Sequence, residues 1–330
     1  MKKQILTAAV AAAIVLPTMA QAGVYGRADG VVRYTDDNTA GGTSAWDVGA
    51  DKMRWGIVGS EDLGNGMKAL YHYEFDMASN NQGNGSTSAT LERTRLANAG
   101  LEGGWGKVVI GRQWWPSYFT TFNKTDTADT HATGASQGNF SGNRSGNMIS
   151  YSSPDFSGFM VGGAILMDDD DATYQAEDVD KYEITGQYKN GPMQIGVAYR
   201  DHDLGAANCV GTACTEESVW GISGSYAFGD LSVEGGYYDY SDDTNNGQDG
   251  DAWNLGATYK MGSTQIHGAY RDSSFDNGPG AASTDTTDWY IGVRHFLSKE
   301  TRVFAEYRQL EVETGPTTTT DTDTFSFGLR

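Results

Sequence analysis

The 330-residue sequence lacks any apolar run after its first two dozen residues that could form a transmembrane helix of about 20 residues. It has only 6 prolines and 2 cysteines, and its 23 lysines and arginines face 43 acids, giving a formal net charge of −20. That charge disfavours a nucleic-acid partner, because phosphate binding needs a basic surface. No motif joins a nucleophile to a base and an orienting group, so neither an enzyme nor a cofactor is expected.

The first residues have the three parts of a secretory signal. Lys2 and Lys3 precede an apolar stretch at 5–16, and Ala20-Gln21-Ala22 has the small-residue pattern of a cleavage site. An N-terminal membrane anchor is the alternative, but the stretch is short for a bilayer span. We therefore predict a cleaved signal peptide at 1–22 and a single mature domain at 23–330.

The two cysteines, Cys209 and Cys214, lie close together in a polar stretch. In an exported chain such a pair predicts a local disulfide. A metal site is the weaker alternative, since only His202 lies nearby, and we assign no metal site.

The mature chain is rich in glycine and aromatic residues and alternates with a period of two. In 253–261, Trp253, Leu255 and Tyr259 share one face, while polar or small residues occupy the other. The segments 193–200 and 302–308 behave in the same way. This alternation predicts strands with one apolar and one polar face.

The connections between the strands alternate in length. Seven short ones are expected near 62–65, 103–105, 153–157, 190–191, 229–230, 261–263 and 297–300. Eight long polar ones are expected at about 36–51, 80–89, 115–145, 169–178, 203–216, 241–250, 274–285 and 312–321. Tight turns at one end and long loops at the other are typical of outer-membrane barrels. We predict an all-β, 16-stranded antiparallel transmembrane β-barrel, wide enough for an aqueous channel; a soluble sandwich is the alternative.

Several strand sequences, taken in order, resemble the general (non-specific) porins of Gram-negative bacteria. They are VYGRADG at 24–30, RWGIVGSEDLGNG at 54–66, TRLA at 94–97, IGRQ at 110–113 and SYSSPDFSGF at 150–159. The resemblance implies a homotrimer in the outer membrane, in contact with lipid and lipopolysaccharide, that passes small hydrophilic solutes. It also implies that the third long loop, about 115–145, folds into the pore.

The resemblance further implies a basic cluster on the pore wall, at Arg27, Arg54, Arg93, Arg95 and Arg144. Arg93 and Arg95 are two residues apart and share a face, and Arg54 has the parity opposite to the lipid-facing Trp55. An arginine facing the midplane of the bilayer would cost roughly 2–4 kcal/mol, so these side chains should face water.

The acids expected to oppose the cluster are Asp126 and Asp129, in the third loop. That loop lacks the Pro-Glu-Phe-Gly-Gly-like motif usual in the family, so the two residues are alternatively solvated loop acids. The many acids in the long loops lead us to expect a weak preference for cations.

A substrate-specific sugar or oligosaccharide porin is the alternative function. It rests on aromatic residues at the start of the third loop, which could line the constriction: Trp114, Trp115, Tyr118, Phe119 and Phe122. The sequence also departs from the family in its second loop, 80–89, which has no acid to meet Arg112 of a neighbouring subunit. Its last residue, Arg330, is not the usual aromatic, which leaves a short truncation open.

Overall fold

The structure is a computed structural model that describes residues 21–77, 92–130, 144–167, 179–203, 216–242, 247–278 and 280–330. Residues 1–20 of the predicted signal peptide lie outside these ranges, and so do the second loop at 80–89 and both cysteines, Cys209 and Cys214. Cleavage after Ala22 and the disulfide therefore stay predictions. Within the described residues, no helix has the length and apolar character that a membrane span requires.

The described residues form seventeen strands in one antiparallel sheet. The strands are β1 (Gln21–Asp37), β2 (Ala45–Gly64), β3 (Met67–Met77), β4 (Glu92–Gly103), β5 (Gly106–Trp114), β6 (Arg144–Ser145), β7 (Met148–Ser152), β8 (Phe159–Leu166), β9 (Lys181–Asn190), β10 (Met193–Asp203), β11 (Glu216–Phe228), β12 (Leu231–Asp242), β13 (Gln248–Met261), β14 (Thr264–Asp276), β15 (Thr284–Phe296), β16 (Arg302–Thr314) and β17 (Thr317–Leu329).

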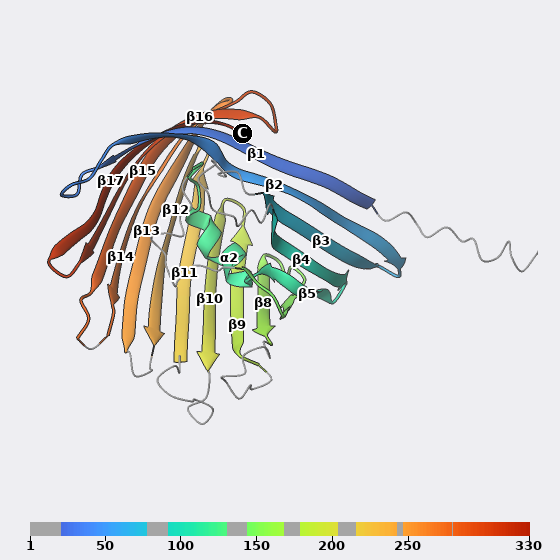
Figure 1. The fold of residues 1–330 in the computed structure, drawn as a ribbon. Coiled ribbons are helices and arrows are strands. Elements are labelled where there is room, and N and C mark those ends of the chain that lie inside the picture. Colours follow the sequence, from blue (N-terminus) through green and yellow to red (C-terminus); the bar gives the residue numbers. More distant parts are fainter. Residues whose placement is uncertain are drawn as a thin grey trace, which may run out of the picture.

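The sheet closes into a barrel because β1 pairs with β2 on one side and with β17 on the other (Figure 1). The short β6 and the following β7 both pair with β5, so they are two parts of one barrel strand, separated by Gly146 and Asn147. The barrel thus has sixteen strands, and the predicted fold class is confirmed. Among the described residues, each of the sixteen barrel strands pairs with a neighbour on both sides.

All seven predicted short turns join consecutive strands where they are expected. In outer-membrane barrels, turns of this kind lie at the periplasmic end. The predicted long loop at 312–321, at the other end of the barrel, is wrong, since only Gly315 and Pro316 separate β16 from β17. The polar run at 317–320 suggests a loop, yet threonine is β-branched and fits an extended strand.

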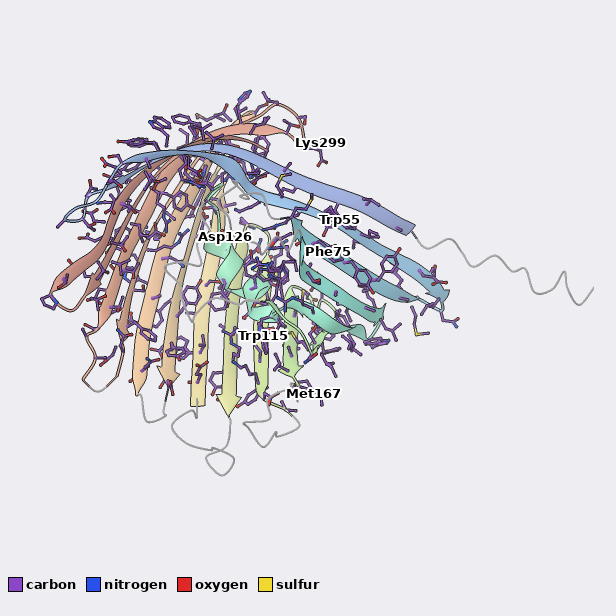
Figure 2. The ribbon with its side chains drawn as sticks, in the orientation of Figure 1. Trp55, Phe75, Trp115, Asp126, Met167 and Lys299 are labelled. Carbon is purple, nitrogen blue, oxygen red and sulfur yellow. The ribbon has the colours of Figure 1, made fainter. Side chains whose placement is uncertain are left out.

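The two faces of the wall differ as the alternation predicts. On β13, Trp253 and Leu255 are exposed on the outside, whereas Asn254 between them is buried on the inner face. Aromatic pairs stack across neighbouring strands on the outside, as Trp55 does on Phe75 with ring centroids 5.0 Å apart (Figure 2). The outer surface is therefore a continuous apolar face suited to lipid.

Replacing Ile184 on the outer face of β9 by arginine should destabilise the barrel by roughly 2–4 kcal/mol, because the charge would face hydrocarbon. Ile184 is 62% exposed on that face. Gln187→Arg places the same group on the lumen side of the same strand and is the control. Urea titration of the barrel folded in lipid vesicles measures both. Equal losses for the two variants would contradict the assignment of the faces.

After β5 the chain leaves the wall, and residues 115–130 lie inside the barrel. This segment contains the short helix α2 (Pro116–Thr120) and the 3-10 turn η1 (Phe122–Thr125), which contact the inner faces of β9, β10 and β12 (Figure 1). Pro116 occupies the first turn of α2, where its missing N–H is not needed. We call residues 115–130 the inward loop.

Candidate functional site

The near end of the inward loop is fixed to the wall by a buried carboxylate. Glu183 of β9 accepts hydrogen bonds from the backbone N–H and the hydroxyl of Ser117, each at 2.6 Å. These bonds satisfy donors at the start of α2 that have no partner inside the helix. One turn later, the carbonyl oxygen of Thr120 lies against Gly196 of β10, where a Cβ atom would come within 1.8 Å of it. Only glycine leaves room for this contact.

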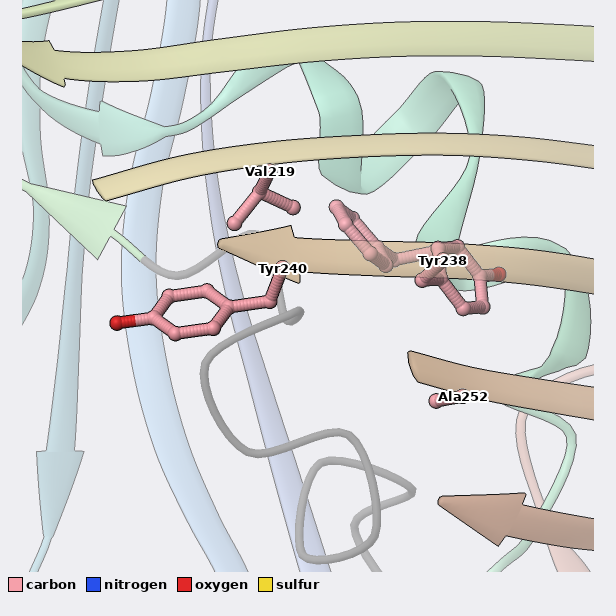
Figure 3. Packing of buried hydrophobic residues seen from close by; sticks show 5 residues of the cluster. Val219, Tyr238, Tyr240 and Ala252 are labelled. Atoms are coloured by element: carbon pink, nitrogen blue, oxygen red, sulfur yellow. The ribbon is translucent and has the colours of Figure 1, made fainter. Parts of the chain in front are cut away.

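The middle of the inward loop packs on the strands that follow β9 in the wall, β10 to β13. The Phe122 ring stacks on Tyr238 of β12, with centroids 4.8 Å apart, in a buried cluster with Val219, Tyr240 and Ala252 (Figure 3). The Lys124 ammonium donates to Gln194 Oε1 at 2.8 Å. The loop therefore crosses the lumen in contact with the wall.

A second buried carboxylate fixes the far end of the loop. Glu306 of β16 accepts from the Asp129 N–H at 2.9 Å and from the Thr130 hydroxyl at 2.5 Å. The Asp129 carboxylate is itself ion-paired with Arg302, with Arg330 at 3.4 Å and with Arg294 at 3.6 Å. The inward loop thus runs from β9 to β16 and the end of β17.

The five predicted arginines lie near one another on the wall formed by β1 to β4 and β6. The strand register places Arg27 opposite Arg54, Arg54 opposite Asp76 and Asp76 opposite Arg93. The Asp76 carboxylate forms ion pairs with three guanidinium groups, those of Arg54 at 3.2 Å, Arg93 at 3.1 Å and Arg95 at 3.1 Å. A bulge in β4 at Arg95 lets that side chain also reach Glu74 at 2.5 Å.

Three carboxylates of this cluster, Asp29, Glu74 and Asp76, are not among the residues predicted from the sequence. Asp29 is buried against Arg27 and Arg330, at 2.6 and 2.9 Å. Glu74 and Asp76 alternate with Tyr73 and Phe75 in β3. The parity argument that places Arg54 in the lumen therefore places these two acids there as well.

Arg144 and Asp126 are connected through two aromatic rings. The Arg144 guanidinium lies 4.4 Å from the centroid of the Trp114 ring, which stacks on Tyr118 at 4.0 Å. The Tyr118 hydroxyl donates to Asp126 at 3.2 Å. Burial, with the nearby Asp126 carboxylate, raises the pKa of Tyr118 to about 12, so the hydroxyl keeps its proton at neutral pH.

A family model described as Gram-negative porin matches residues 6–315 of the chain. The chain belongs to this family. Outer membrane porin protein 32 of Delftia acidovorans is 31% identical over 258 residues, which cover 71% of this chain and 68% of the relative. An outer membrane porin protein of Bordetella pertussis is 28% identical over 258 residues, which cover 69% of this chain and 66% of the relative.

Solved porin structures share the fold of this porin. The anion-selective porin from Comamonas acidovorans superposes with a TM-score of 0.77 at 21% identity, covering 94% of this chain and 99% of that one. OmpF of Salmonella typhi gives a TM-score of 0.70 at 14% identity, covering 94% of this chain and 97% of that one. This likeness confirms the fold, and the family match makes the protein a diffusion channel of the Gram-negative outer membrane.

The two predicted loop acids of this porin, Asp126 and Asp129, lie in different surroundings. Asp126 is partly exposed and lies close to the Trp114 side of the arginine cluster. Asp129 is 1% exposed and pairs with arginines of β15 and β16 and with Arg330, which follows β17, instead of the predicted five. The expectation that Asp129 faces the predicted cluster is therefore corrected: Glu306 and the arginines around it hold Asp129 against another part of the inner wall.

The aromatic residues of the inward loop do not form one exposed ladder. Trp115 and Phe122 are each 3% exposed and attach the loop to the wall, whereas Phe119 is 53% exposed. The relatives named above are described as porins without a sugar in their names. The sugar-specific alternative is not favoured.

His267 belongs to no sequence motif and resembles an ordinary strand histidine, but it lies fully buried beside the far anchor of the loop. Its Nε2 is 3.3 Å from Glu306 and 3.7 Å from Asp129, a spacing that suits a metal ion. Three arginines already surround Asp129, and their charge opposes a further cation there. The group serves to hold the loop, and no local sequence pattern marks it.

Proposed function

We propose that the inward loop and the five arginines form the constriction of this porin and give it a preference for anions. The observation that carries the proposal is the local charge balance. Five arginines, Arg27, Arg54, Arg93, Arg95 and Arg144, stand with three carboxylates, Asp29, Glu74 and Asp76. Arg93 has 75% of its side chain exposed, so its charge is available to passing ions.

This sign differs from the weak cation preference expected from the acid-rich loops. Salt screens charges beyond about 10 Å at 0.1 M, so loop acids act weakly on an ion inside the barrel. An ion within about 4 Å of a guanidinium gains roughly 1 kcal/mol even in water. The arginine charges on the wall should therefore have more influence on the ion preference than the acids of the long loops. The similar fold titled an anion-selective porin agrees with this sign.

Asp126 supplies the opposing negative charge on the loop side of the same passage. Its carboxylate accepts a hydrogen bond from the Tyr118 hydroxyl, and the Tyr118 ring stacks on Trp114. The Arg144 guanidinium lies over the Trp114 ring. Opposed charges across water create a transverse field that favours polar over apolar solutes. Transport needs no catalytic step in this arrangement.

We propose further that residues 1–22 are removed on export and that the barrel assembles as a homotrimer surrounded by lipid and lipopolysaccharide. One structure of the same fold, OmpT of Vibrio cholerae at 17% identity and a TM-score of 0.68, is titled a trimer form. The broad apolar outer face supports burial against lipid or a second barrel. Cross-linking of native membranes tests the assembly, and a monomer alone would contradict it.

The test of selectivity is the reversal potential of the purified protein in a planar bilayer across a KCl gradient. We expect a reversal potential with the sign that a preference for chloride over potassium gives. A potential of the opposite sign would overturn the anion preference while leaving the diffusion channel intact.

A further inference from the structure

We propose that a recess beneath α2 binds small zwitterionic solutes with an apolar side chain, such as hydrophobic amino acids. The inference rests on the proposed diffusion through the lumen, which brings solutes to the recess. The recess has a volume of about 470 Å³ and lies between α2 and the wall of β4, β5, β7, β8 and β9. This volume is within the range of about 300–1,000 Å³ typical of small-ligand sites.

Two opposite charges face this recess without pairing with each other. Glu102 of β4 and Lys107 of β5 lie directly opposite in the strand register, and both line the recess. Both are half-buried. Within the described residues, neither side chain makes a hydrogen bond or an ion pair of 4.0 Å or less. An ammonium and a carboxylate on one solute would satisfy both.

Lys68 provides a useful contrast. It is the register partner of Glu102 on β3, carries the same charge as Lys107 and is exposed. It does not line the recess. Charge at this end of the wall can therefore be changed inside or outside the recess independently.

The opposite side of the recess is apolar. Phe119 of α2 is 53% exposed and lines it, although the neighbouring aromatics Trp115 and Phe122 are buried in the wall. Pro116 and Met160 extend this apolar surface. Covering the Phe119 ring with an apolar side chain would remove apolar surface from water and so stabilise a complex. Neutral donors and acceptors complete the lining, at Thr185 and Gln187.

These features together select a zwitterion with an apolar side chain. A simple ion can pair with only one of the two charges, and it gains nothing from Phe119. An apolar solute without charges would leave Glu102 and Lys107 without partners and displace their water. A hydrophobic amino acid matches both charges and the ring.

The test measures phenylalanine binding to the detergent-solubilised, full-length protein by saturation-transfer NMR. We expect weak binding, with weaker signals for 3-phenylpropionate, 2-phenylethylamine and glycine, each of which lacks one of the three groups. Lys107→Gln and Glu102→Gln should each raise the dissociation constant roughly three- to fivefold, as for partly exposed ion pairs. Phe119→Ser should also weaken binding. Lys68→Gln, the matched control, should leave it unchanged.

The combined exchange Glu102→Lys with Lys107→Glu should restore binding, because a small zwitterion can turn round. Equal binding of 3-phenylpropionate and phenylalanine, or equal losses for Lys68→Gln and Lys107→Gln, would overturn the proposal. Channel conductance in KCl is recorded on the same preparations. Normal conductance without phenylalanine binding would refute the recess alone, whereas absent conductance would refute the diffusion channel.

Discussion

Glu306→Ala is expected to release the far end of the inward loop and raise the single-channel conductance. The substitution leaves the buried Asp129 N–H and the Thr130 hydroxyl without their acceptor. Each unsatisfied buried donor costs about 1–3 kcal/mol, so docking of the loop should weaken by roughly 2–6 kcal/mol. A change of about 3 kcal/mol would already lower the equilibrium constant for docking by more than a hundredfold.

Glu313→Ala is the control for this prediction. Glu313 lies on the same strand and carries the same charge, but it is exposed. Conductance and current noise in planar bilayers compare the two variants. If Glu306→Ala folds and conducts like the parent, the loop does not depend on this anchor. Glu183→Ala, which removes the anchor of Ser117 at the other end, gives a second and independent measurement.

The pair Arg54→Gln with Arg93→Glu should invert the ion preference. The cluster would change from five arginines with three carboxylates to three arginines with four. Each unit of charge about 4 Å from a passing ion is worth roughly 1 kcal/mol in water, so a net change of three charges should reverse the sign of the selectivity. Arg95 is left in place because it is buried and holds both Glu74 and Asp76.

Lys299→Glu makes a comparable change of charge in the turn after β15, away from the inward loop (Figure 2). It should leave the selectivity nearly unchanged. The reversal potential in a KCl gradient measures both variants. Equal shifts would mean that the total charge of the protein, and not the cluster, sets the preference.

The barrel was predictable because its signals are local. Alternation in β13 predicts that Trp253 faces lipid and that Asn254 faces the lumen. Tight-turn sequences mark where one strand ends and the next begins. The polar run at 317–320 led to a wrong prediction because a β-branched polar segment suits both a loop and the end of a strand.

The site was only partly predictable because its contacts are remote in sequence. Asp129 meets side chains from β14 to β17, and no spacing along the chain reveals that His267, Arg302 and Arg330 converge on it. The bulge at Arg95 also shifts the parity of β4, so the arginine and the adjacent Leu96 are both buried. The acids of β3 are different, because the alternation of that strand alone is enough to place them in the lumen.

Single-channel recording of the purified protein in a planar bilayer tests the central claim most directly. An open, water-filled porin predicts ohmic current steps, grouped in triplets for a trimer, that added oligosaccharides do not block. A folded protein that inserts into the bilayer without conducting would contradict the account.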